Sequence, residues 1–203
     1  MTVLAPSRLE VLVEEPSAEA ALNALLPKIV PEAGFQIIPF NGKSDLLRKL
    51  PVRLRDYTYY WAESGLRIVV LLDRDGDDCV ELKARLVEIA NKARLPGEAT
   101  LFRIVIEELE AWFLGDVPAL NAAYPRVPLS LENQTKFRDP ENVPGGAWEG
   151  LEHVLQKHGY HRKGLQKVRA ASEIAPHMDI ENNRSKSFQV FRDGLRRLVK
   201  EGN

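Results

Sequence analysis

The sequence predicts an α/β fold built on an open, mainly parallel β-sheet that is flanked by helices and followed by a helical C-terminal appendage. Strand-like and helix-like segments alternate through the first 124 residues, which is typical of a parallel sheet with crossover helices. The run 67–72 is apolar after its first residue, as expected for a strand buried on both faces of such a sheet. A chain of 203 residues with 44% hydrophobic and 28% charged residues is long enough for one main core.

The first part of the chain shows two strand-like and two helix-like segments. Branched residues alternate with others in the first segment, and an Ala-rich run follows it. The pair Asn41-Gly42 ends the second strand-like segment, and Ser44 is a suitable helix cap. In chain order, we expect a strand at 9–13, a helix at 18–26, a strand at 35–38 and a short helix from Ser44 to Leu50.

The middle of the chain repeats the pattern around the apolar run 67–72, which we expect to be a central strand. Apolar residues then recur at spacings of four, three and four from Leu82 to Ala93, as on one face of an amphipathic helix. A further strand is predicted at 100–106, and a helix at 107–114. Trp112 and Phe113 of this helix are expected in the core.

Residues 125–203 form the predicted appendage, packed on a first domain of residues 1–124. Its first part, 125–146, is rich in Pro and Asn and is expected to be a loop or linker. Helical periodicity then predicts helices near 148–157, 165–174 and 188–199.

Several classes of protein are disfavoured by composition. The longest apolar run is too short to cross a bilayer, and the N-terminal residues lack the apolar core of a signal peptide, so we expect a cytoplasmic protein without a membrane partner. Cys79 is the only cysteine, which fits a reducing compartment. The four histidines show no ligand spacing and are expected at the surface, so a zinc site is disfavoured.

Acidic residues follow three of the predicted strands. These are Glu14-Glu15, Asp73-x-Asp75 and the run 107–110, which includes Glu110. The carboxyl ends of parallel strands meet at one edge of a sheet, where like charges repel unless a cation neutralises them. Oxygen ligands favour Mg²⁺ or Mn²⁺, and two such ions can assist displacement at a phosphodiester. Each acidic turn also has a plain structural explanation as a loop or helix cap, and the coincidence of three strand ends favours the metal site.

The C-terminal part of the chain carries a local excess of positive charge. From Lys157 onward there are eleven Lys/Arg and five Asp/Glu, although the net charge of the whole chain is −1. This tail is either a solvated helical surface or a phosphate-binding face, and the sequence leaves both alternatives open.

Three motifs resemble the Toprim pattern of topoisomerases, primases and OLD-type nucleases, and more closely a family of stand-alone Toprim-like proteins. They begin at Glu14, at Asp73 and at Glu108, where the sequence is Glu-Leu-Glu-Ala-Trp, and the likeness extends into Arg184-Ser185-Lys186-Ser187-Phe188. One departure is Glu15, because this resemblance leads us to expect Gly after the acidic residue. A side chain there is expected to crowd the backbone or to add a ligand.

The resemblance implies a Toprim fold with Glu14 as general acid/base and with Asp73 and Asp75 as metal ligands. Glu110 is an added candidate ligand, and Lys163 is a weaker match to a lysine that OLD-like nucleases place near the scissile phosphate. It therefore implies a Mg²⁺- or Mn²⁺-dependent nuclease, with a role in phage defence or DNA processing. DNA is favoured over RNA as substrate. The candidate nucleic-acid contacts are Lys43, Arg184 and Lys186.

The sequence also suggests two other functions. The first is a non-catalytic binding module or a partner subunit of an AAA- or ABC-type ATPase, which the same resemblance implies. The second is a degenerate nucleotide-binding site at Asn41-Gly42-Lys43-Ser44, between a strand and a helix. A P-loop requires Gly where this chain has Ile37, and Pro39 removes a backbone N–H that would hold phosphate, so the sequence disfavours this second function.

Overall fold

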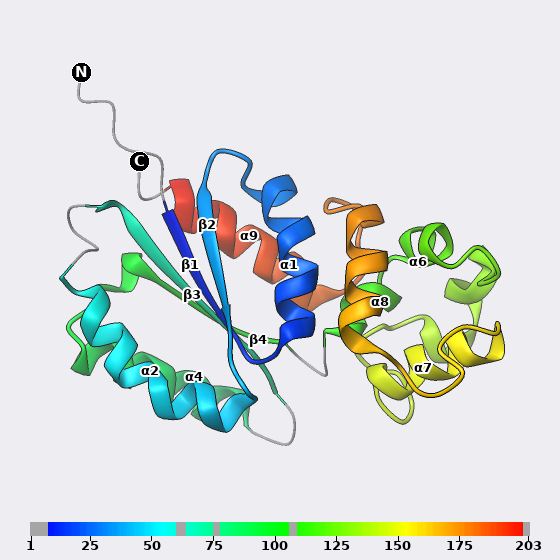
Figure 1. Cartoon of the computed structure of the whole chain (residues 1–203), viewed down its shortest axis with the longest axis horizontal. Helices are drawn as coiled ribbons and strands as arrows, with labels where there is room; N and C mark the ends of the chain where they lie inside the picture. Colours follow the sequence, from blue (N-terminus) through cyan, green and yellow to red (C-terminus); the bar gives the residue numbers. More distant parts are fainter. Residues whose placement is uncertain (1–7, 60–63, 75–77, 106–108, 201–203) are drawn as a thin grey trace.

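The computed structural model describes residues 8–59, 64–74, 78–105 and 109–200. Within these ranges four parallel strands form one sheet in the order β2-β1-β3-β4 (Figure 1). Strands β1 and β3 occupy the centre of this sheet, and the sequence predicts this position for β3. The strands are β1 (Arg8–Val13), β2 (Gly34–Pro39), β3 (Leu66–Asp73) and β4 (Thr100–Val105).

Helices cover both faces of the sheet (Figure 1). One face packs against α1 (Pro16–Ile29) and α9 (Lys186–Lys200), and the other packs against α2 (Lys43–Tyr57) and α4 (Cys79–Lys92). Alternate residues of the central strands fill the two cores: Val69 and Leu71 belong to the first, and Ile68 and Val70 to the second. Successive side chains of a strand point to opposite faces, and helices cover both faces here, so a central strand can be apolar at successive positions.

Helix α2 is longer than the sequence predicts. It was expected to end at Leu50, but it continues through Pro51 to Tyr57. Proline inside a helix costs about 3 kcal/mol, yet Leu46, Leu50 and Leu54 are all fully buried against the sheet. Burial of a leucine contributes about 1.5–3 kcal/mol, so packing of the second half of the helix offsets the cost of the proline.

The remaining helices lie beside the carboxyl ends of the strands (Figure 1). The segment 125–146 between them is not a free linker, because Val127, Leu131, Phe137 and Val143 are buried in the same hydrophobic cluster as α1 and β1. The appendage therefore shares its core with the sheet. Its helices are α5 (Glu110–Leu114), α6 (Val117–Ala123), α7 (Ala147–Lys157) and α8 (Lys167–Ile174).

The sequence Arg184-Ser185-Lys186-Ser187-Phe188 has a structural role at the start of α9. The buried Glu141 carboxylate accepts hydrogen bonds of 2.6 Å from the Ser185 hydroxyl and from the Ser187 backbone amide. The Ser187 hydroxyl in turn accepts a hydrogen bond of 3.0 Å from the indole of Trp112, which is fully buried. This network fixes α9 to α5 and to the loop that carries Glu141.

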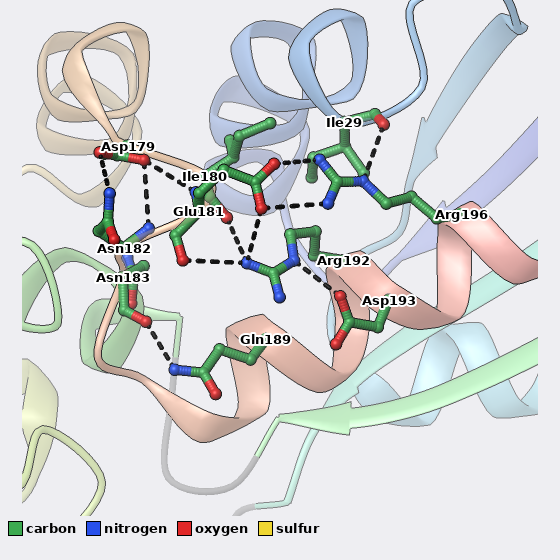
Figure 2. Close-up of polar contacts among 10 residues, drawn as sticks. All are labelled: Ile29, Asp179, Ile180, Glu181, Asn182, Asn183, Gln189, Arg192, Asp193 and Arg196. Atoms are coloured by element: carbon green, nitrogen blue, oxygen red, sulfur yellow. Dashed lines mark hydrogen bonds and ion pairs between the residues drawn. The ribbon is translucent and has the colours of Figure 1, made fainter.

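The connection before α9 is held to that helix by polar contacts (Figure 2). Arg192 donates hydrogen bonds to the main-chain carbonyls of Ile180 and Glu181, at 2.7 and 3.2 Å. Arg196 reaches the Glu181 carboxylate. In the part of the chain that the structure describes, no helix is both long and apolar enough to cross a membrane.

Candidate functional site at the carboxyl ends of the strands

Glu14 and Asp73 lie together at the carboxyl edge of the sheet. Strands β1 and β3 are adjacent and parallel, with Val13 in register with Leu71. The residues that follow are therefore neighbours, and the Asp73 backbone amide donates a hydrogen bond of 3.2 Å to Oε2 of Glu14. The predicted convergence of these two strand ends is confirmed.

Asp73 experiences the negative charge of three other carboxylates. Burial raises its pKa well above the usual value, and the charges of Glu14, Glu110 and Glu15 raise it further, while Lys167 lowers it. Like charges near a partly buried carboxyl group disfavour its ionised form, which raises its pKa. We call this group, Glu14, Glu15, Asp73, Glu110 and Lys167, the carboxylate edge.

Glu110 is brought to the carboxylate edge by α5, at the first residue of that helix. Its side chain is only 2% exposed, and Oε1 lies 3.8 Å from Nζ of Lys167. The same ammonium group lies 3.9 Å from Oε1 of Glu15. Lys167 thus supplies positive charge between two carboxylates that come from different parts of the sequence.

Lys167 is the residue that sequence reasoning missed. The resemblance suggested Lys163, which is exposed in the loop before α8, whereas Lys167 is the first residue of α8. Helix α8 packs directly against α1, which begins at the end of β1, and this packing carries Lys167 to the edge. Nζ of Lys167 also lies 5.7 Å from the ring centroid of Trp148. The only sequence signal was the charge of the tail, which does not distinguish among its eleven Lys/Arg.

Glu15 does not strain the backbone in the position where Gly was expected. Its φ of −147° and ψ of 163° are extended, and it is the residue that precedes α1. The hydroxyl of Ser17 donates a hydrogen bond to its carboxylate. Its side chain therefore adds an acidic group next to Lys167 without crowding the main chain.

Lys43 lies at the rim of the carboxylate edge. Its ammonium group donates a hydrogen bond of 2.9 Å to the main-chain carbonyl of Arg74, the residue after Asp73. The turn before it is tied to β1, because the Gly42 amide donates a hydrogen bond of 2.9 Å to the carbonyl of Glu14. Gly42 has a φ of +85°, a conformation that favours glycine.

The other predicted nucleic-acid contacts do not join this group. Arg184 donates hydrogen bonds of 3.1–3.4 Å to three main-chain carbonyl groups, so its guanidinium holds the chain around it. Lys186 is exposed at the start of α9. The carbonyl groups bound by Arg184 belong to Leu114, Phe137 and Arg138.

Much of the basic tail is used inside the molecule. Figure 2 shows Arg192 and Arg196 directed at Glu181, and Arg192 also forms an ion pair of 2.8 Å with Asp193. Together with Lys167 and Arg184, these residues account for a large part of the local positive excess. The tail is thus not one continuous phosphate-binding face.

Three acidic positions of the predicted cluster, Asp75, Glu107 and Glu108, lie outside the described residues. Among the residues that are described, no group of three or more His, Cys, Asp or Glu side chains is arranged around a common point that could hold a metal ion. The carboxylates offer only hard oxygen donors, which suit Mg²⁺ or Mn²⁺. The Lys167 ammonium, which lies near both Glu15 and Glu110, would repel such an ion.

His161 was expected at the surface, but it is partly buried and hydrogen-bonded. The Gln166 amide donates to Nδ1 at 3.1 Å, so the neutral ring carries its proton on Nε2, which lies 2.8 Å from the Tyr124 hydroxyl. Burial raises the pKa of the Tyr124 hydroxyl, and the nearby Glu173 carboxylate of α8 raises it further. Burial lowers the pKa of His161. The network fixes the loop that leads into Lys167.

Comparison with known proteins identifies one family whose model matches this chain. The model of a family described as a domain of unknown function, DUF4276, matches residues 13–196. This range begins at the last residue of β1 and ends inside α9, so it contains the whole carboxylate edge. No curated protein and no solved structure matches the chain.

Proposed function

For this chain, which belongs to the DUF4276 family, we propose the activity of a Mg²⁺- or Mn²⁺-dependent nuclease of the Toprim type. The site for this chemistry is the carboxylate edge. The proposal combines the motifs at Glu14, Asp73 and Glu110 with the arrangement of these residues.

One observation carries the proposal. Acidic side chains from two other segments, Glu14-Glu15 and Glu110, raise the pKa of the partly buried Asp73, and desolvation raises it further. A protein gains no stability by collecting carboxylates in a poorly solvated place, because each charge disfavours its neighbours. Strongly perturbed acidic groups of this kind are most often found where function requires them.

The residues proposed to hold an ion are Glu14, Asp73 and Glu110, whose side chains would have to move closer together around it. The sequence adds Asp75 to this set, and that residue lies outside the described ranges. A bound divalent ion would neutralise charge on the scissile phosphate and lower the pKa of an attacking water. Glu14 is the proposed general acid/base, and its carboxylate is oriented by the 3.2 Å hydrogen bond from the Asp73 amide. We assign the phosphate-contacting lysine to Lys167, because the exposed Lys163 has no contact with the carboxylate edge among the described residues.

The proposed substrate is nucleic acid, with DNA favoured over RNA. Lys43 is a candidate for a further phosphate contact, because it binds the carbonyl of Arg74 at the rim of the carboxylate edge. The exposed Lys163 and Lys186 are further candidates. A role in phage defence together with an AAA- or ABC-type ATPase is part of the same proposal.

The decisive experiment is a nuclease assay on plasmid, linear double-stranded and single-stranded substrates with Mg²⁺, Mn²⁺ or EDTA. We expect metal-dependent cleavage by the wild-type chain. Asp73→Asn and Glu14→Gln should each abolish it, while the exposed control Arg162→Ala should cleave like wild type. Cleavage that persists in Asp73→Asn at the wild-type rate would contradict the assignment, because it would come from another site or from a contaminant.

A second function is favoured by the position of Lys167. Its ammonium already supplies positive charge to Glu15 and Glu110 at 3.9 and 3.8 Å, so the cluster is partly neutralised without an ion. We therefore also propose a non-catalytic binding module or ATPase partner subunit as the alternative. Nucleic-acid binding without Mn²⁺ binding and without cleavage would favour this alternative.

A further inference from the structure

A second charged feature lies at the opposite end of the strands, where β4 begins and α9 approaches its end. A cavity of about 190 Å³ is lined there by Thr100, Arg103, Gly194 and Arg197, among others. Thr100 is the first residue of β4, whereas Asp73 pairs with Val105 at the other end of that strand. This cavity is therefore separate from the carboxylate edge.

A glycine inside α9 makes room for the Arg103 side chain. A Cβ atom at Gly194 would lie 2.4 Å from Nη2 of Arg103, which is closer than Cβ atoms approach other groups, and 3.0 Å from Cζ. Glycine inside a helix costs about 1 kcal/mol relative to alanine. The chain thus gives up helix stability at the place where the guanidinium group packs against α9.

The Arg103 guanidinium has few internal acceptors. Nη1 donates a hydrogen bond of 3.1 Å to the carbonyl of Phe102, and Nε is buried with no acceptor among the described residues. Burial lowers the pKa of Arg103, and the charge of Arg197 lowers it further. Two positive groups therefore face one cavity and repel each other.

The acidic residues nearby do not neutralise this pair. Glu98 lines the cavity but is exposed, and within the described ranges it forms no ion pair with Arg103 or Arg197. Asp193 is paired with Arg192 at 2.8 Å, on the side of α9 drawn in Figure 2.

A third arginine adds positive charge at this end of the sheet. Arg67 on β3 is 7% exposed, and it precedes Ile68, the register partner of Thr100. Its Nε is also buried without an acceptor in the part of the chain described. Burial of one of these cations close to two others is costly unless an anion pairs with them.

We propose that the cavity between β4 and α9 binds a phosphate group, held by Arg103 and Arg197 with the Thr100 hydroxyl as a further donor. The cavity has room for several atoms, because one water occupies about 30 Å³ of the liquid. Guanidinium groups bind phosphate through paired charge-assisted hydrogen bonds, which explains the choice of two arginines. The phosphate is either inorganic or the terminal group of a nucleotide.

The test is calorimetric titration of the full chain with inorganic phosphate and, separately, with a nucleoside monophosphate, in EDTA and at constant ionic strength. We expect saturable binding by the wild-type chain. Arg197→Ala removes an exposed side chain and should fold normally, and it should weaken binding about tenfold or more, as expected for loss of a charge-assisted contact. Tighter binding of the nucleotide than of phosphate would identify a nucleotide as the source, and equal affinities would identify phosphate itself.

Two further variants test the role of Arg103 and control for a general effect of removing an arginine. Gly194→Ala should displace the Arg103 guanidinium and weaken phosphate binding, with folding checked by thermal melting. The matched control Arg162→Ala, an exposed arginine in the loop before α8, should bind like wild type. Equal phosphate affinity in wild type and Arg197→Ala, or no saturable binding by wild type, would overturn the proposal.

Discussion

The ammonium group of Lys167 lies 3.8 Å from the carboxylate of Glu110, whose side chain is only 2% exposed. Lys167 is carried to this position by the packing of α8 against α1, the helix that begins at the end of β1. Lys167 is the counter-charge of the carboxylate edge in this structure, and an added cation must compete with it.

The first prediction follows from that competition. Lys167→Met should bind Mn²⁺ more tightly than the wild-type chain in the absence of substrate, because it removes the positive charge and leaves the carboxylates. The expected gain is about tenfold, equivalent to about 1.4 kcal/mol. Calorimetric titration with Mn²⁺ measures it. Lys163→Met is the control and should match wild type; weaker Mn²⁺ binding by Lys167→Met would show that this lysine supports the metal site instead.

The second prediction concerns pH. The folded-state pKa of Asp73 is raised, so its contribution to stability is present below the usual value of 3.8 and is lost as pH rises through the folded-state pKa. Asp73→Asn cannot ionise and should therefore melt at a higher temperature than wild type at pH 7 in EDTA, with a difference that shrinks towards pH 4. Thermal melting across this range checks it.

A control of opposite sign is available for that experiment. The Arg192 side chain lowers the pKa of Asp193, so this carboxylate contributes stability above its usual pKa of 3.8 and loses it as pH falls. Asp193→Asn should not raise the melting temperature at pH 7. An equal rise in both variants would point to a general effect of removing negative charge.

The third prediction concerns the close approach of two chain segments at Gly115. A Cβ atom there would lie 2.4 Å from Oδ1 of Asn183 and 2.8 Å from the backbone nitrogen of Ser185. Gly115→Ala should lower the free energy of unfolding by about 1–3 kcal/mol, as in other overpacked sites. Chemical denaturation measures the change. Gly97→Ala is the matched control, because nothing lies within 4 Å of its added Cβ atom.

The fourth prediction concerns the buried indole of Trp112. Ser187→Ala removes the acceptor of its 3.0 Å hydrogen bond and leaves a buried N–H without a partner. We expect a loss of about 1–3 kcal/mol in the free energy of unfolding. Denaturation followed by tryptophan fluorescence checks it. Ser172→Ala, which removes an exposed hydroxyl of α8, should cost much less; equal losses would mean that the buried network adds no stability.

The alternation of strands and helices could be predicted from the sequence because it depends on local periodicity. Side chains on one face recur every two residues in a strand and every three to four residues in a helix. The apolar run of β3 and the spacing of apolar residues in α4 therefore indicate both the type of element and its buried side chains. The meeting of Glu14 and Asp73 was also predictable, since parallel strands place their carboxyl ends at one edge. The end of α2 was predicted wrongly, because the burial of Leu54 against the sheet is a tertiary contact that the local sequence pattern does not show.

What the sequence alone determined is therefore the class of fold and the acidic half of the carboxylate edge. Only the tertiary structure decided which basic residue joins it: Lys167 was selected over Lys163 by the packing of α8 on α1. It also assigned Arg184 to main-chain carbonyls and brought Arg103 against Gly194, 91 positions later in the chain. The sequence shows which residues are charged but not which groups they contact. The packing of the folded chain determines where each of these side chains lies.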